Sequence, residues 1–159
     1  MALIYVLSHP SIVKSMVLTG SSGLYENAFG GSFPRRGSYD FIKEKVEYTF
    51  YDPNVATKEL VDDVFRIIND RHSVIRILAM AKSAIRHNMK KDLHKITVPV
   101  SLIWGRDDKI TPPEVAVEFS QELPDAELHW IDHCGHAPMM EQPAAFNKVL
   151  KGFLERIRV

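Results

Sequence analysis

Several features are scarce or absent in this sequence of 159 residues. It has one cysteine, Cys134, so an internal disulfide cannot form and a reducing, cytoplasmic location is expected. Its 20 basic and 20 acidic residues cancel, which argues against a basic surface for nucleic acid. No apolar run approaches the roughly 18 residues that a membrane span needs. The sequence therefore predicts a protein that binds neither nucleic acid nor a membrane.

The composition is that of an ordinary globular protein, with 45% hydrophobic and 25% charged residues, and the length suits one domain. The apolar start, Met1 to Ser8, lacks the charged leader and the small-residue cleavage site of a signal peptide. It also lacks an N-cap residue, so we expect the chain to begin within an element. Periodicity alone leaves open whether that element is a buried strand or the end of a buried helix.

The first half of the chain predicts one strand followed by a helical block. The strand is expected over 12–19, where Gly20-Ser21-Ser22-Gly23 ends it, and a loop is expected from Asn27 to Gly37. Apolar residues at helical spacing then predict three helices, over 39–50, 58–69 and 73–87. The third of these carries Ile75, Leu78, Ala79 and Ile85.

The second half predicts strands that alternate with helices. Strands are expected over 98–104 and 126–131. Between them, Thr111-Pro112-Pro113-Glu114 predicts a capping box that opens a helix to about Leu123. A last helix is expected from Pro143, with apolar residues at 146, 149, 150, 153, 154 and 157. This order predicts an α/β fold with a short parallel sheet of about three strands and crossover helices.

Acidic and imidazole side chains follow the two predicted C-terminal strands. Asp107 and Asp108 come just after the strand over 98–104, and His136 follows the next strand, 28 residues beyond Asp108. The carboxyl ends of neighbouring parallel strands meet at one edge of a sheet. We therefore expect a carboxylate beside an imidazole, which fixes its tautomer and stabilises the imidazolium of a general base.

These segments, Trp104-Gly-Arg-Asp-Asp-Lys-Ile-Thr-Pro-Pro113 and His133-Cys-Gly-His-Ala-Pro138, resemble the acid and histidine loops of α/β-hydrolases. The subgroup with the nearest likeness contains meta-cleavage-product C–C hydrolases and related esterases. The resemblance implies a hydrolase core over 1–23 and 94–159 and a helical cap inserted over 24–93. It makes Asp108 the acid and His136 the base of a Ser-Asp-His triad, and Asp107 a solvated turn residue. It implies a small ester or ketone-type substrate and neither a cofactor nor a metal ion.

The sequence departs from this resemblance at the nucleophile. The family's serine lies in a Gly-x-Ser-x-Gly elbow, and no such motif occurs here. In the resemblance the elbow and the oxyanion loop precede Met1, and residues 1–8 are the tail of the helix after the elbow. Two functions stay open: a hydrolase whose serine lies outside this chain, or an inactive truncated module. Such a module would self-associate or pair with an N-terminal fragment through the exposed edge of the strand over 12–19.

Other reactive side chains offer weaker alternatives. Ser21 or Ser22 could act as a nucleophile, and so could Cys134, although Cys134 lies only two residues from His136. Arg35 and Arg36 either hold a substrate carboxylate or belong to a solvated loop. Met139 and Met140 either line the pocket or pack in the core. The remaining histidines have neither a metal-ligand spacing nor a catalytic partner in the sequence; they are His9, His72, His87, His94, His129 and His133.

Overall fold

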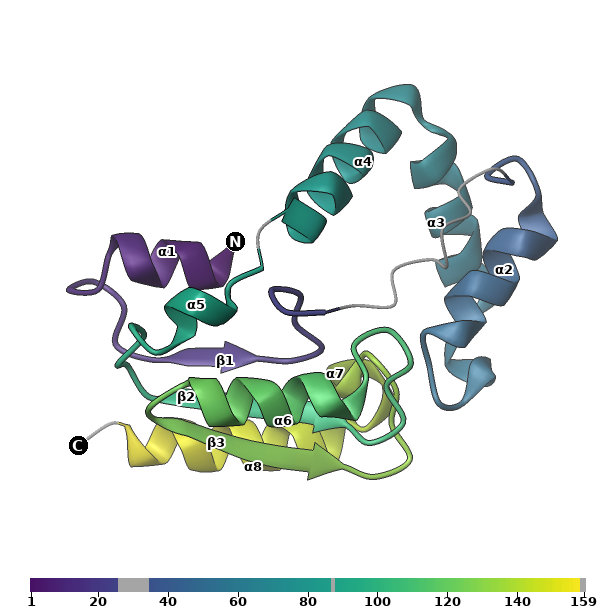
Figure 1. The fold of residues 1–159 in the computed structure, drawn as a ribbon. Coiled ribbons are helices and arrows are strands. Elements are labelled where there is room, and N and C mark those ends of the chain that lie inside the picture. The colour runs from purple at the N-terminus through teal and green to yellow at the C-terminus, as the bar shows by residue number, and fades with distance from the viewer. Residues whose placement is uncertain (26–34, 87, 158–159) are drawn as a thin grey trace.

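A three-stranded parallel sheet lies at the centre of the computed structural model, which describes residues 1–25, 35–86 and 88–157 (Figure 1). Its strands are β1 (Met16–Leu18), β2 (Val100–Gly105) and β3 (Ala126–Ile131), in the order β1-β2-β3. Val100 aligns with Met16 on one side and with Ala126 on the other. The predicted α/β class and parallel sheet are confirmed. β3 has the predicted bounds, whereas β1 is shorter than the predicted strand over 12–19.

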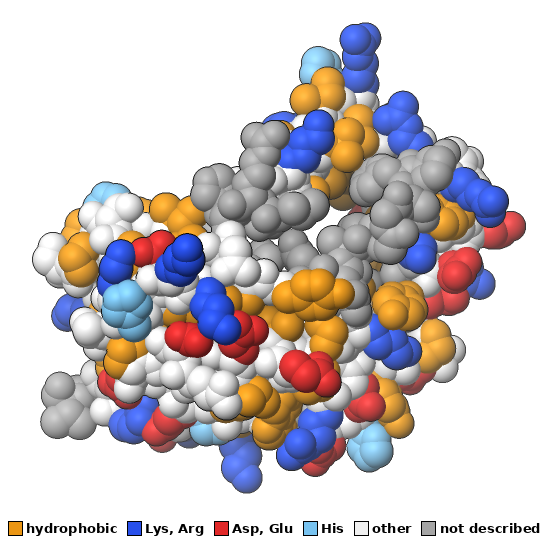
Figure 2. Space-filling view, viewed as in Figure 1, with side chains coloured by type: hydrophobic (Ala, Val, Ile, Leu, Met, Phe, Trp, Pro, Cys, Tyr) orange, Lys and Arg blue, Asp and Glu red, His pale blue; other side chains and the backbone are white. Residues whose placement is uncertain are grey.

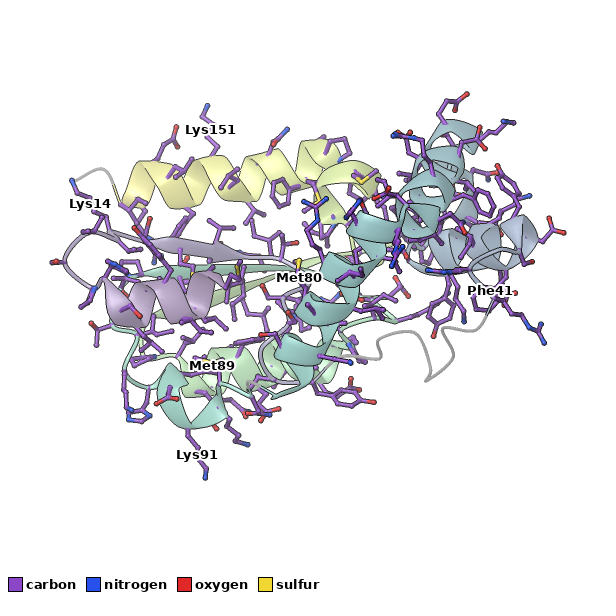
Figure 3. The ribbon with its side chains drawn as sticks, turned by 90° about the horizontal axis from the view of Figure 1, so that it is seen from above. Lys14, Phe41, Met80, Met89, Lys91 and Lys151 are labelled. Atoms are coloured by element: carbon purple, nitrogen blue, oxygen red, sulfur yellow. The ribbon has the colours of Figure 1, made fainter. Side chains whose placement is uncertain are left out.

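Helices cover both faces of this sheet. Their bounds are α1 (Ala2–Ser8), α5 (Lys90–Leu93), α6 (Pro113–Glu122), α7 (Pro138–Glu141) and α8 (Pro143–Arg156). Leu102 and Trp104 of β2 point to a core formed with α1, α5 and α6, where Phe119 is fully buried. Ile103 points to the opposite face, which α8 covers with Phe146 and its neighbours. Figure 3 shows α8 on one side of the strands and α1 and α5 on the other.

The start of the chain is a helix rather than a strand. Leu3 and Val6 of α1, spaced as on one helix face, are buried in the main core, while Ile4 and Tyr5 are exposed. No side chain caps the first turn. The helical alternative left open by the sequence is therefore correct.

The helical block α2–α4 lies beside the sheet, and α4 rises away from it (Figure 1). It contains α2 (Tyr39–Tyr48), a short 3-10 helix η2 (Pro53–Val55), α3 (Lys58–Asn69) and α4 (Arg71–Arg86). Side-chain oxygens of Ser38 and Thr57 accept the N–H groups that open α2 and α3. All three predicted helices are present. Most of the predicted loop over 27–37 lies outside the described residues.

The inner face of α4 differs from the predicted apolar stripe. Val74 is 4% exposed and Ile77 is half-buried, whereas Ile75 is 58% exposed. Leu78 and Ala79 are exposed as well. Among the elements that the structure describes, α4 packs mainly against α3, and Val74 is the one fully buried residue in the part of α4 whose side chains are described. The helix was therefore predicted correctly, but not the side that it buries.

Charges of both signs are spread over the surface. In Figure 2 basic and acidic side chains are interspersed on the visible face. No helix within residues 1–25, 35–86 and 88–157 is long and apolar enough to cross a membrane. The cytoplasmic location expected from the single cysteine stays a prediction.

Candidate active site

The acid loop begins where β2 ends and holds Asp108 in a buried position. Its side chain is fully buried, and three donors surround its carboxylate. The N–H groups of Ile110 and Thr111 donate to Oδ1 at 2.8 and 2.9 Å, and the hydroxyl of Thr111 donates to Oδ2 at 2.7 Å. A buried carboxylate is stable only when hydrogen bonds replace its lost water. The loop therefore fixes both the position and the orientation of Asp108.

The predicted capping box at Thr111 is wrong. The N-cap position of α6 is Pro112, and no side chain caps this helix. Thr111 is fully buried, and its hydroxyl and N–H are both engaged with Asp108. In a capping box the threonine oxygen accepts a backbone N–H of its helix. Here α6 begins one residue later than the pattern predicted, and the Thr111 hydroxyl donates to the nearby carboxylate instead. Thr111 is thus part of the site rather than part of a cap.

The histidine loop follows β3 and brings His136 against this carboxylate. Nδ1 of His136 lies 2.9 Å from Oδ2 and 3.2 Å from Oδ1 of Asp108. The carboxylate accepts from Nδ1–H, which leaves the lone pair on Nε2. The imidazole side chain is 27% exposed, while that of Asp108 is not exposed at all. The structure therefore brings together the two residues predicted as acid and base, with the tautomer that a general base needs.

Backbone contacts hold the two loops together. The N–H of Asp107 donates to the carbonyl of Cys134 at 2.9 Å, and that of Arg106 donates to the carbonyl of Ile131 at 3.0 Å. A methyl group at Gly105 would overlap the carbonyl oxygens of Cys134 and Gly135. Only glycine allows this approach, so the end of β2 and the histidine loop form one unit.

Cys134 is unsuited to nucleophilic attack. Its side chain is fully buried, and its sulfur contacts the Gly135 carbonyl and the Glu141 carboxylate. Burial, reinforced by Glu141, raises the pKa of this thiol to about 12. The attacking species in cysteine chemistry is the thiolate, which is negligible here at neutral pH. The alternative of Cys134 as a nucleophile loses its physical basis.

Among the described residues, none of the other candidate side chains hydrogen-bonds to Asp108 or His136. Asp107 is exposed, as expected for a solvated turn residue. Ser21 is half-buried and Ser22 is exposed, and in the described part of the chain neither hydroxyl bonds to His136. His133 contacts the Tyr51 hydroxyl at 3.2 Å, and His9 stacks on Tyr5. No group of three or more metal-ligating side chains occurs among the described residues.

An apolar cavity of about 450 Å³ adjoins the histidine loop. Side chains of α2 and α3 form most of its wall, Ile77 of α4 contributes, and Ala137 and Met140 close it on the side of His136. Its charged lining residues are Arg36 and Lys45, both basic. Arg35 is exposed and lies outside the lining, and Met139 is 41% exposed. The sequence left open whether Arg35 and Arg36 hold a substrate and whether Met139 and Met140 line a pocket. One residue of each pair, Arg36 and Met140, lines this cavity.

Two residues of the site carried no recognisable signal in the sequence. Thr111 was predicted as a helix cap, and the sequence offered no prediction for Glu141. The Glu141 carboxylate accepts the N–H groups of Gly135 at 2.8 Å and Tyr51 at 2.7 Å. Tyr51 lies 90 residues and Gly135 lies 6 residues before Glu141 in the sequence, so no local spacing reveals these contacts.

A parallel sheet with a buried carboxylate–imidazole pair at its carboxyl edge is the arrangement of an α/β-hydrolase. A family model described as serine aminopeptidase, S33, matches residues 50–143, more than half of the chain. The chain belongs to this family within the α/β-hydrolase superfamily.

Curated relatives extend the match over nearly the whole chain. A 2-hydroxy-6-oxononadienedioate/2-hydroxy-6-oxononatrienedioate hydrolase of Pseudomonas sp is 28% identical, over 94% of this chain and 57% of that protein. A 2-hydroxy-6-oxo-6-(2'-aminophenyl)hexa-2,4-dienoic acid hydrolase of Metapseudomonas resinovorans is 29% identical, over 93% of this chain and 53% of that protein. The chain thus spans little more than half the length of these relatives.

Solved structures agree on the fold. An α/β-hydrolase enzyme from the metagenome of sediments of the lagoon of Mar Chica, Morocco, is 42% identical, with a TM-score of 0.71. That match covers 98% of this chain and 56% of the other. A meta-cleavage product hydrolase from Pseudomonas fluorescens IP01 has a TM-score of 0.81 at 21% identity, over 98% of this chain and 60% of the other, and supports the fold alone.

Proposed function

We propose that this chain supplies the acid and the base of a Ser-Asp-His triad, in a hydrolase that cuts a C–C bond next to a carbonyl or an ester. The observation that carries the proposal is the contact of 2.9 Å between Oδ2 of Asp108 and Nδ1 of His136. A buried carboxylate in this position orients the imidazole and stabilises its protonated form. Asp108 is therefore the acid and His136 the base.

In the proposed mechanism the free Nε2 of His136 removes the proton from a serine hydroxyl as the serine attacks the substrate carbonyl. The resulting imidazolium is stabilised by Asp108 and returns the proton to the leaving group, a carbon for C–C cleavage or an alkoxide for an ester. Water then repeats the cycle and releases the acyl group. No Gly-x-Ser-x-Gly motif occurs in these 159 residues. We propose that the serine comes from a polypeptide segment outside this sequence.

The proposed substrate is a small molecule of the 2-hydroxy-6-oxo-dienoate type. Two curated relatives carry names of hydrolases for such compounds, which favours C–C cleavage over ester hydrolysis. Residues 24–93, with helices α2–α4, would form the cap, and residues 1–23 and 94–159 the core. The apolar cavity between α2, α3 and the histidine loop would then take the apolar part of the substrate.

A chimera tests this proposal. In the 42%-identical metagenomic hydrolase, the part that matches this chain is replaced by this chain, and hydrolysis of 2-hydroxy-6-oxo-6-phenylhexa-2,4-dienoate and of a short p-nitrophenyl ester is measured. We expect activity with one or both substrates. In the chimera, Asp108→Asn should lower kcat by about 10⁴-fold, and His136→Ala should do likewise. A folded chimera whose activity is unchanged by either substitution would refute the roles of these residues.

A second candidate function is that of a self-associating module. It is favoured by the position of β1 at the edge of the sheet, where its one partner among the described strands is β2. The exposed Ile4 and Tyr5 of the neighbouring α1 add apolar surface. Light scattering of the purified chain at micromolar concentration tests it. A monomer would exclude this function, whereas a dimer that also lacks hydrolysis would favour it.

A further inference from the structure

Glu141, the last residue of α7, connects two distant parts of the chain through its carboxylate. Oε1 accepts the N–H of Gly135 at 2.8 Å and that of Ala137 at 3.4 Å, on either side of His136. Oε2 accepts the N–H of Tyr51 at 2.7 Å, just after the end of α2. One side chain therefore holds the histidine loop and the segment after α2 with its two oxygens.

A second contact joins the same two segments directly. The N–H of His136 donates to the carbonyl of Thr49 at 3.0 Å. A methyl group at Gly135 would lie 2.8 Å from both the Thr49 carbonyl oxygen and the Tyr51 nitrogen, so the two backbones touch here. The loop that carries His136 cannot shift without moving residues 49–51.

Residues 49–51 and the histidine loop also share the apolar cavity. Thr49 and Phe50 line it from one segment, and Ala137 and Met140 line it from the other. The carboxylate of Glu141 accepts N–H groups from both sides of this wall. Its charge also contributes to the raised pKa of the neighbouring Cys134 thiol, as expected for an ionised carboxylate in a partly buried place.

We infer that Glu141 is a positioning residue that couples occupancy of the cavity to the placement of the His136 imidazole. It does so by holding the Tyr51 N–H, next to the cavity-lining Thr49 and Phe50, and the backbone of the histidine loop in one register. This inference rests on the proposed function insofar as it treats His136 as the base and the cavity as the substrate site. Hydrogen bonds from two segments to one carboxylate lock their relative position more firmly than either alone.

The test replaces Glu141 with glutamine, which keeps the shape but cannot accept through its NH₂ end. Toluene serves as the cavity probe, since apolar cavities bind small aromatic molecules. In the unaltered chain, toluene should move the NMR signals of the Thr49 amide and of the His136 imidazole, including Nδ1–H. In Glu141→Gln the Thr49 signal should still respond, while the response of the imidazole should be lost. Retention of the imidazole response, or its absence in the unaltered chain, would overturn the inference.

Two controls separate coupling from general damage. Glu155→Gln removes an exposed carboxylate of α8 that pairs with Lys151, and it should leave both responses intact. Tyr51→Phe removes the contact of the Tyr51 hydroxyl with His133 but keeps the Tyr51 N–H, so it should also leave them intact. If Glu141→Gln does not fold, Glu141→Asp keeps the charge on a side chain one methylene shorter, too short to reach both segments. The response of the His136 imidazole to toluene should therefore be lost in Glu141→Asp as well.

A kinetic measurement in the chimera distinguishes this inference from the proposed function. Glu141→Gln should lower kcat by about 10²-fold, the effect of a misplaced catalytic group, with little change in KM. The NMR responses need no hydrolysis, so an inactive chimera would count against the proposed function and leave the coupling intact. An active chimera in which Glu141→Gln changes only the melting temperature would count against the coupling alone.

Discussion

Gly20 lies directly against His136. A Cβ atom at Gly20 would lie 2.8 Å from both Cε1 and Nδ1 of the imidazole. The backbone of Gly20 has φ +49, a conformation that favours glycine. The chain just beyond β1 therefore packs directly against the imidazole.

Replacing Gly20 with alanine should displace the imidazole from Asp108. In the chimera we expect kcat to fall by about 10²-fold, because small errors in the placement of a catalytic group are costly. In the isolated chain the NMR signal of Nδ1–H should shift or disappear. Gly37→Ala is the matched control, because nothing lies within 4 Å of a Cβ at that position. Equal activity of the two alanine variants would contradict the prediction.

Thr111→Val should destabilise the fold through Asp108. The change keeps the shape of the side chain but removes the hydroxyl that donates to Oδ2 at 2.7 Å. Oδ2 keeps Nδ1–H of His136 as a donor, but the loss of one hydrogen bond to a charged group costs about 1.5–3 kcal/mol. Urea denaturation should show this loss in the free energy of unfolding, whereas Thr97→Val at an exposed position should change it little. A Thr111→Val chain as stable as the unaltered one would mean that water or another donor replaces the hydroxyl.

The Cys134 thiol should make the stability of the chain fall at high pH. Burial raises its pKa from 9.0 to about 12 in the folded chain. The unfolded chain therefore releases this proton near pH 9, while the folded chain keeps it. The contribution of the thiol to the free energy of unfolding is complete below pH 9 and is lost as the pH rises toward 12. Cys134→Ala should show a shallower decline over pH 9–11, and parallel curves for the two proteins would refute the raised pKa.

Ser101→Ala is expected to stabilise the chain. The residue lies in the middle of β2 with no exposed surface, and its Oγ has no hydrogen-bond partner among the described residues. Burial of an unpaired hydroxyl is unfavourable, so its removal should raise the free energy of unfolding by about 1 kcal/mol. Ser120→Ala, which removes an exposed hydroxyl on α6, serves as the reference in thermal unfolding. A lower melting temperature for Ser101→Ala would indicate that the hydroxyl fills space needed in the core.

Regular elements with strong periodicity were predictable from the sequence. α3 and β3 have the predicted bounds, because each is delimited by a cap, a turn residue or a change of pattern. Helices α5 and α7 were missed, since four residues are too few to show a period. The inner face of α4 was missed for a different reason. A helix that packs along one narrow line leaves its other apolar residues exposed, and the sequence does not reveal which line is used.

Within the site, the proximity of the acid and histidine loops followed from topology, since neighbouring parallel strands bring their carboxyl ends together. The choice of Asp108 rather than Asp107 followed from the family resemblance. The sequence did not predict which other groups hydrogen-bond to Asp108 or hold the histidine loop. From the sequence, Thr111 could either cap a helix as an acceptor or donate its hydroxyl to the acid, and only the three-dimensional path of the loop decides between these roles. Glu141 bonds to backbone groups, which carry no residue-specific signal in a sequence.

The close approach of Gly105 to the histidine loop has a consequence for how this protein can be divided. Segment 49–51, the end of β2, the acid loop and residues 134–141 meet through their backbones, with no room for a methyl group at two of the contacts. Gly20 approaches the His136 carbonyl as closely. A split version of this protein, assembled from two separately expressed fragments, should therefore be cut before residue 20 or after residue 141. A cut between them would require the fragments to rebuild a glycine-to-carbonyl contact without a covalent connection.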